Sequence, residues 1–191
     1  MFQSISSFIT APQTFVVLQV LVVTLFVALL FIWSTYNAFV AKMNQVKNDF
    51  SDIVVELQRR TSLIEQLVLM VKEYAKHEKG TYENVAKARS ALDTSKSIDD
   101  TVKAENMITD TLRSLFAVVE NYPDLKAQEN FKSVMSSLED TENRVAKYRE
   151  GYNITVQRYN NSVEMFPSNL IAKLFNFKSE DYFKVDAQNI K

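Results

Sequence analysis

The longest apolar run in the chain lies near its N-terminal end. From Phe15 to Trp33 the only polar residues are Gln19 and Thr24. About 20 apolar residues, at ~1.5 Å of helical rise each, span a hydrocarbon core of ~30 Å. The apolar side chains surround the helix instead of forming one stripe, unlike those of a helix that buries one face on a core. The run therefore predicts a transmembrane helix.

Two alternatives to a membrane span do not fit this segment. A cleaved signal peptide has a basic start, an apolar run of about 7–15 residues and a small-residue cleavage site, and this chain shows none of them. A buried core helix of this length usually carries some charge. Trp33 and Tyr36, at the C-terminal end of the run, also suit the aromatic belt of a membrane interface.

Flanking charge predicts the orientation of the span. No residue before Lys42 is charged, whereas Lys42 and Lys47 follow the span closely, and Arg59 and Arg60 come next. The positive-inside rule then places the N-terminus outside and the rest of the chain in the cytoplasm. We expect a transmembrane anchor over residues 1–35 and a cytoplasmic helical domain with an amphipathic C-terminal tail over residues 36–191.

Beyond the anchor, apolar residues recur at alternating steps of three and four, which places them on one stripe of a helix. The stripe consists of Tyr36, Phe39, Met43, Val46, Phe50, Ile53 and Leu57, and after Arg60 it continues with Ile64, Leu67, Val71 and Tyr74. One helix could therefore run from the membrane to about Ser90. However, Ser62 and Glu65 have the spacing of a capping box, which would start a new helix after a turn. These residues alone leave both alternatives open.

The remaining segments are also predicted to be mostly helical. Residues 92–100, rich in Ser, Thr and Asp, indicate a loop, and a helix follows over about 98–122. Pro123 ends it, because the residue before a proline avoids the helical region. A last long helix is expected over 125–165. The apolar tail 170–183 is expected to dock on the protein's own core, with the lipid interface as the alternative.

Composition narrows the possible functions. The chain has no Cys and one His, which excludes disulfides, thiolate nucleophiles and Cys- or His-rich metal sites. Its 22 Lys and Arg balance 23 Asp and Glu, so a bulk electrostatic basis for nucleic-acid binding is missing. Only 2 Gly and 3 Pro favour long helices with few turns. We expect an all-α protein with no nucleic-acid partner.

No catalytic constellation is evident in the sequence. The single imidazole, His77, stands between Lys76 and Glu78 in a charged stretch typical of a solvated helix face. Carboxylates at helical spacing occur, but their ordinary role is surface salt bridging. Two isolated glycines cannot form a phosphate-binding loop. We expect a protein that is not an enzyme, with no cofactor and no metal.

Two charged residues interrupt the apolar stripes. Arg60 stands between Leu57 and Ile64, and Glu142 between Leu138 and Val145. A buried charge costs several kcal/mol unless it is paired, so opposite charges on facing helices suggest an ion pair. We hypothesise an Arg60–Glu142 structural ion pair, extended by Arg59 or Arg144. The alternative is that both side chains reach solvent at a helix end.

Several blocks of the sequence carry a resemblance to a known family. They are Glu56–Arg60, Val71–Lys79, Tyr122–Lys126, Thr141–Arg144 and Phe166–Ala172, in this order. Their residues and order resemble those of the LemA family of bacterial membrane proteins. One departure is Glu65, which stands where the family commonly has a proline.

The resemblance implies a fold and a location. It implies an antiparallel, up-and-down four-helix bundle behind a single N-terminal anchor in the bacterial cytoplasmic membrane. The family's proline would suit a helix start at Glu65, which favours a hairpin near Arg60–Ser62. The family has no established catalytic residues to transfer to this chain.

We therefore expect a membrane-anchored scaffold that works by interaction, and that self-assembles or binds a membrane protein. Tyr152-Asn153 and Tyr159-Asn160 repeat after seven residues and so share a helix face. Tyrosine supplies both apolar area and a hydroxyl group, which suits an interface. The alternative for these residues is that they complete the protein's own core.

Two other functions are alternatives to a scaffold. The chain would be an accessory or regulatory subunit if it bound a membrane protease or another envelope enzyme. An oligomeric pore would need polar residues along one stripe of the span, for which Gln19 and Thr24 are thin support.

Overall fold

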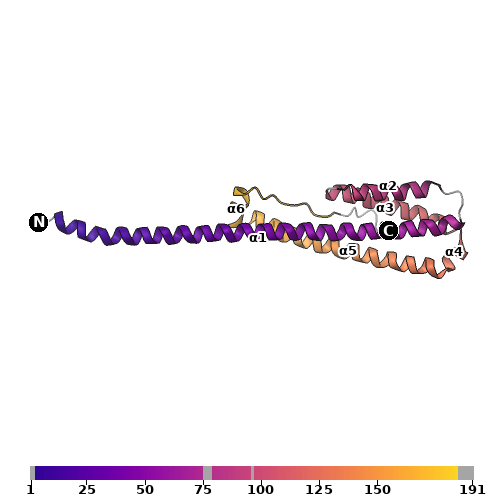
Figure 1. The fold of residues 1–191 in the computed structure, drawn as a ribbon, viewed down its shortest axis with the longest axis horizontal. Coiled ribbons are helices and arrows are strands. Elements are labelled where there is room, and N and C mark those ends of the chain that lie inside the picture. Colours follow the sequence, from indigo (N-terminus) through magenta and orange to yellow (C-terminus); the bar gives the residue numbers. More distant parts are fainter. Residues whose placement is uncertain (1–2, 75–78, 96, 185–191) are drawn as a thin grey trace. The chain divides into compact units, whose positions relative to one another are not determined.

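The structure, a computed structural model, describes residues 3–74, 79–95 and 97–184, with side chains described from residue 14 onward and, after the first gap, from residue 83. All regular structure in these ranges is helical (Figure 1). The helices are α1 (Gln3–Tyr74), α2 (Lys79–Asp93), α3 (Ile98–Val119), α4 (Pro123–Ala127), α5 (Glu129–Glu164) and α6 (Ser168–Leu174).

The chain forms two compact units, and the long helices α1 and α5 contribute to both. The N-terminal unit combines Met1–Met43 with Tyr159–Ser179. The central unit combines Asn44–Arg158 with Glu180–Lys191. The compact units do not divide at residue 35, because residues 159–179 associate with the N-terminal part of α1. The expected functional division into an anchor and a cytoplasmic domain remains a prediction.

In the N-terminal unit, the apolar side chains of α1 are exposed from Phe15 to Phe31. This helix has the length and composition to cross a membrane, with a mean hydropathy of 3.0 over its most apolar window. No other helix within the described residues meets the same criterion. Beyond Trp33, the ring of Phe39 stacks on that of Phe177 with centroids 4.8 Å apart. Tyr36 contacts Phe175 at the same centroid distance, so the segment around α6 docks on α1.

In the central unit, α1 continues without a turn to Tyr74, so the hairpin favoured near Arg60–Ser62 is wrong. Ser62 does not cap a helix, because its hydroxyl donates to the carbonyl of Gln58 one turn earlier at 3.1 Å. Glu65 instead accepts from Arg89 of α2 at 2.9 Å. The apolar stripe explains the continuity: Ile53, Leu57, Ile64, Leu67 and Val71 are all buried in one phase.

Helices α2 and α3 form an antiparallel pair that packs beside α1. Gln58 donates to Asp93 at 3.2 Å, and Arg89 lies beside Glu65, so α2 runs opposite to α1. Helix α3 begins with a side-chain cap, in which the backbone N–H of Asp100 donates to the Ser97 hydroxyl at 3.2 Å. The loop predicted over 92–100 is shorter in the structure, because α2 ends at Asp93 and α3 begins at Ile98.

Helix α5 runs antiparallel to α1 within the central unit. Successive contacts join Tyr74 to Gln128 at 2.5 Å and the ring of Phe50 to that of Tyr152 at 6.0 Å. Pro123, expected to end a helix, occupies the first position of the short helix α4, where its missing N–H costs nothing. The pairings agree in direction with an up-and-down bundle, whose full helix order remains a prediction.

Candidate functional site: a buried charge network beside an apolar groove

Six charged side chains from three helices of the central unit take part in ion pairs between helices. We call them the charge network: Glu56 and Arg60 of α1, Glu105 of α3, and Glu142, Arg144 and Arg149 of α5. Three carboxylates face three guanidinium groups, so their formal charges cancel. Buried charges are tolerated when they are paired in this way.

Arg60 is the most deeply buried member. Its side chain is 5% exposed, with Nη2 2.9 Å from Glu142 Oε2 and Nη1 3.8 Å from Glu105 Oε1. Burial lowers the pKa of Arg60, and the charge of Glu142 opposes that shift. Arg60 therefore holds a carboxylate on each of two other helices, α3 and α5.

Glu105 lies between two arginines. It contacts Arg149 as well as Arg60, and its side chain is 11% exposed. Burial and the nearby charge of Arg60 lower the pKa of Arg149 to about 10, which still leaves it protonated at neutral pH. At the other edge of the network, Arg144 Nη2 lies 3.2 Å from Glu56 Oε2.

The structure brings Arg60 and Glu142 together, but with unequal burial. Glu142 is 52% exposed, whereas Thr141 fills the buried position next to it. Arg144 pairs with Glu56 instead of extending the Arg60 pair, and Arg59 is exposed on the surface. The pair therefore joins a core arginine to a carboxylate at the edge of the core.

Glu105 and Arg149 are the members that the sequence reasoning missed. Glu105 stands three residues before buried Ile108, in register with the apolar stripe of α3. A charge inside an apolar stripe is the same pattern that identifies Arg60. On α5, a step of three from Val145 leads to Tyr148 and a step of four leads to Arg149. Both steps are helical, but Tyr148 is exposed to solvent.

Tyr152 and Asn153 hold the C-terminal segment of the central unit. The Tyr152 hydroxyl donates to the carbonyl of Asp181 at 3.0 Å. The Asn153 amide donates to the carbonyl of Phe183 at 3.1 Å and accepts from its N–H at 2.8 Å. Arg149 also lies over the Phe183 ring, 5.0 Å from its centroid, which connects this segment to the charge network.

The structure places Tyr152, Asn153, Tyr159 and Asn160, the residues expected at an interface with a partner, within the protein's own packing. Tyr152 is buried and Asn153 is half-buried beneath the C-terminal segment. Tyr159 and Asn160 are buried in the N-terminal unit, where the Tyr159 ring meets Phe39 edge to face at 6.3 Å. The seven-residue repeat marks an inward face of α5, and a role of these side chains in an interface remains a prediction.

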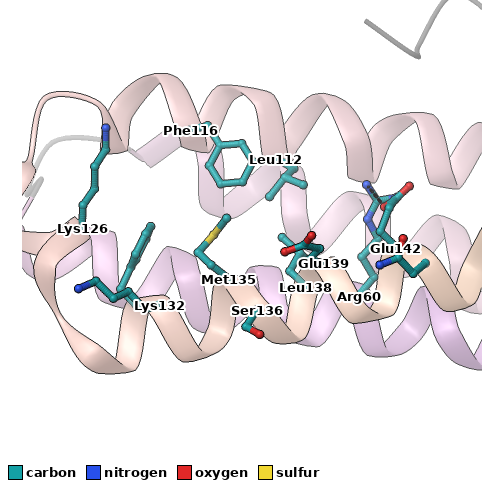
Figure 2. A pocket seen from close by; sticks show the side chains of 12 residues that line it. Arg60, Leu112, Phe116, Lys126, Lys132, Met135, Ser136, Leu138, Glu139 and Glu142 are labelled. Carbon is teal, nitrogen blue, oxygen red and sulfur yellow. Dashed lines mark ion pairs between the residues drawn. The ribbon is translucent and has the colours of Figure 1, made fainter.

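An open groove of about 710 Å³ lies beside the charge network, mainly between α3 and α5 (Figure 2). Its apolar wall consists of Leu112, Phe116, Phe131, Met135 and Leu138. Figure 2 shows Lys126 and Lys132 toward one end, and Glu139, Glu142 and Arg60 toward the other. The groove is therefore apolar along its middle and carries opposite charges at its two ends.

The titratable side chains offer no alternative centre within the residues that the structure describes. There, no group of three or more His, Cys, Asp or Glu residues is arranged to hold a metal ion. His77 lies outside the described residues, so the structure does not place the only imidazole.

Comparison with known proteins identifies the family. The sequence profile of the LemA family matches residues 49–191. The chain is 29% identical to the magnetosome proteins MamQ 1 and MamQ 2 of Paramagnetospirillum magneticum, with 88% of this chain and 71% of each relative covered. It is 26% identical to magnetosome protein MamQ of Magnetospirillum gryphiswaldense, with 78% and 64% covered. The profile match spans most of the chain, which thus belongs to the LemA family as a membrane-associated helical protein.

Proposed function

We propose that this protein is a non-enzymatic scaffold anchored in the bacterial cytoplasmic membrane, and that its central unit binds a protein helix in the groove between α3 and α5. The groove itself is the observation that carries the proposal. Its apolar wall comes from two helices, α3 and α5, each of which is joined to α1 by an ion pair with Arg60.

The groove suits an amphipathic helix. Leu112, Phe116 and Met135 are half-buried and leave apolar surface open, which an apolar helix face can cover. Lys126 and Lys132 at one end favour acidic residues of the ligand helix, while Glu139 at the other end favours basic ones. Opposite charges at the two ends set the direction in which the ligand lies.

The comparisons support a structural role. The MamQ relatives are named for a cell structure, the magnetosome, and not for a chemical reaction. The apolar part of α1 supplies an anchor that would hold such a scaffold at a membrane. The partner is then a second copy of this chain or another membrane protein.

The first test is the mass of the full-length protein in nanodiscs, measured by native mass spectrometry with every co-purifying chain identified. A defined homo-oligomer supports a self-assembling scaffold. One stoichiometric foreign chain supports an adaptor, and a protease as that chain would make the protein its accessory subunit. A monomer with no partner contradicts the scaffold proposal.

The second test asks whether the groove is the binding surface. Met135→Glu places a charge in its apolar middle, and we expect at least a ~10-fold weaker assembly or partner affinity, equivalent to about 1.4 kcal/mol. Leu69→Glu is the matched control, because Leu69 is an exposed apolar residue of the central unit that does not line this groove. Equal effects of the two variants would mean that the groove is not the interface.

A further inference from the structure

A second apolar surface of the N-terminal unit lies at the end of the apolar stretch of α1. It consists of Met165, Phe166, Leu170, Leu174 and Phe175, which we call the α6 patch. These side chains are 45–77% exposed, and the most exposed is Phe166. Soluble proteins rarely expose such a cluster of large apolar side chains to water, so the patch indicates a surface that binds lipid or another protein.

The patch is not the face with which α6 docks on the protein. Ile171 and Ala172 are 6% and 1% exposed and form that docking face. Leu170 and Leu174, four residues apart, share a different face, and both are more than half exposed. The short helix thus carries apolar residues both inward and outward.

Ring contacts fix the position of the patch along α1. Phe175 contacts Tyr36 with centroids 4.8 Å apart, and Phe177 contacts the same ring at 5.7 Å. Tyr36 is three residues after Trp33, about 4.5 Å further along the helix. The patch therefore lies level with the C-terminal end of the apolar stretch, where a spanning helix meets the headgroup region.

Nearby charges fit the same location. Lys173 and Lys178 are exposed on either side of Phe175. Lys42 of α1 is also exposed and donates to the Ser162 hydroxyl of α5 in the same unit. Lysines around an apolar surface are typical of elements that lie in a bilayer interface and contact anionic headgroups.

We propose that the α6 patch inserts into the lipid interface beside the span, as a second membrane contact of this chain. The continuity of its apolar surface with the exposed end of α1 favours lipid over a second copy of the protein. The inference rests on the proposed membrane anchor, and it adds that residues from the far end of the chain return to the bilayer surface.

The experiment uses single fluorophores on the full-length protein in nanodiscs that contain anionic lipid. The chain has no Cys, so Leu170→Cys and Leu69→Cys each provide one labelling site. Leu69 is the control, because its exposed fraction, 51%, is close to the 56% of Leu170. Quenching by bromines at two acyl-chain depths reports lipid contact, and quenching by iodide reports contact with water.

We expect the label at position 170 to lie about 5–10 Å into the headgroup and acyl boundary, protected from iodide, and the label at position 69 to be open to iodide. Trp33, the single tryptophan, reports on the span in the same samples.

Three outcomes would contradict the inference. If Trp33 is quenched by brominated lipid but position 170 is as open to iodide as position 69, the α6 patch is not a lipid contact, and only the proposed anchor is supported. If position 170 is shielded from both quenchers, a protein covers the patch and the inference is overturned. If Trp33 itself escapes the lipid quencher, the proposed anchor and this inference both fail.

Discussion

The charge network stabilises the central unit through Arg60 more than through Glu142. Arg60→Met would leave buried Glu105 with only one guanidinium, and we expect a loss of about 3 kcal/mol in the free energy of unfolding. Glu142→Gln should cost less than about 1 kcal/mol, because Glu142 is half exposed. Denaturant unfolding of the extracted protein measures both changes. Equal losses in the two variants would contradict a role for Arg60 that depends on Glu105.

Tyr152 gives the central unit a response to alkaline pH. Burial, and then the charges of Glu180 and Asp181, raise the pKa of Tyr152 to about 12. Because the folded state holds this proton more tightly, its stabilising effect is present below pH 10 and is lost as the pH rises through about 12.

We therefore expect Tyr152 to be among those of the 8 tyrosines that ionise late in an absorbance titration of the folded protein, and Tyr152→Phe to lower the amplitude of the late step by one tyrosine. A variant with an unchanged late step would assign it to another tyrosine. Phenylalanine also removes the hydrogen bond to Asp181, so the variant should be about 1 kcal/mol less stable at pH 8.

At the scale of single residues, the sequence could identify Arg60 because a charge inside an apolar stripe is visible in the residues alone. It could not identify which carboxylates Arg60 meets, because the contacts of α1 with α3 and α5 depend on how three helices pack. Glu105 also lies in register with the apolar residues of its helix, so the same pattern could have identified it. The choice between Tyr148 and Arg149 was not decidable, since steps of three and four are equally helical.

At the scale of whole elements, the continuity of α1 is the main departure from what the family resemblance implied. The stripe kept its phase across Arg60 and so allowed one helix, whereas Ser62 and Glu65 allowed a cap. The structure uses Glu65 for a contact with Arg89 and leaves Ser62 bonded within the helix. A capping box forms only where a helix begins. The buried apolar residues of α1 keep one helical phase across Ser62 and Glu65, so no helix begins there.

The continuous helix has a direct test in Glu65→Pro. A proline in a helix interior removes a backbone hydrogen bond and clashes with the preceding turn, so we expect a loss of about 3 kcal/mol in unfolding free energy. Glu65→Gln is the control, and it should lose less than about 1 kcal/mol because the pair with Arg89 is partly exposed. If the proline variant were as stable as the control, a helix start near this position would fit better than a continuous α1.

The ends of the other helices were predicted to within a few residues where the residues carried a local signal. Pro123 marks a break that the structure contains, and the helix expected to end at residue 165 ends at Glu164. The docking site of the C-terminal segment could not be predicted, because Tyr152 and Asn153 bind backbone groups of Asp181 and Phe183. Backbone contacts of this kind leave no pattern in the sequence.

At the scale of the whole molecule, the orientation in the membrane is the prediction with the widest consequence. Positive charge follows the apolar stretch and is absent before it, which favours a cytoplasmic central unit. In intact cells stripped of their outer layers, we expect Lys184→Cys to resist a membrane-impermeant maleimide and to react only after permeabilisation. Ser7→Cys should react without permeabilisation. The opposite pattern would invert the proposed topology.

The balanced charge network also limits how this protein can diverge. A substitution that removes one arginine leaves a buried carboxylate less well compensated until a second substitution removes that acid as well. Members of the family should therefore exchange the charged residues at positions 60, 105, 142 and 149 together, so that the set stays neutral or becomes apolar. Family sequences that lack only one of these charged residues should be rare. We therefore expect the charged core positions of this bundle to change together and not one at a time.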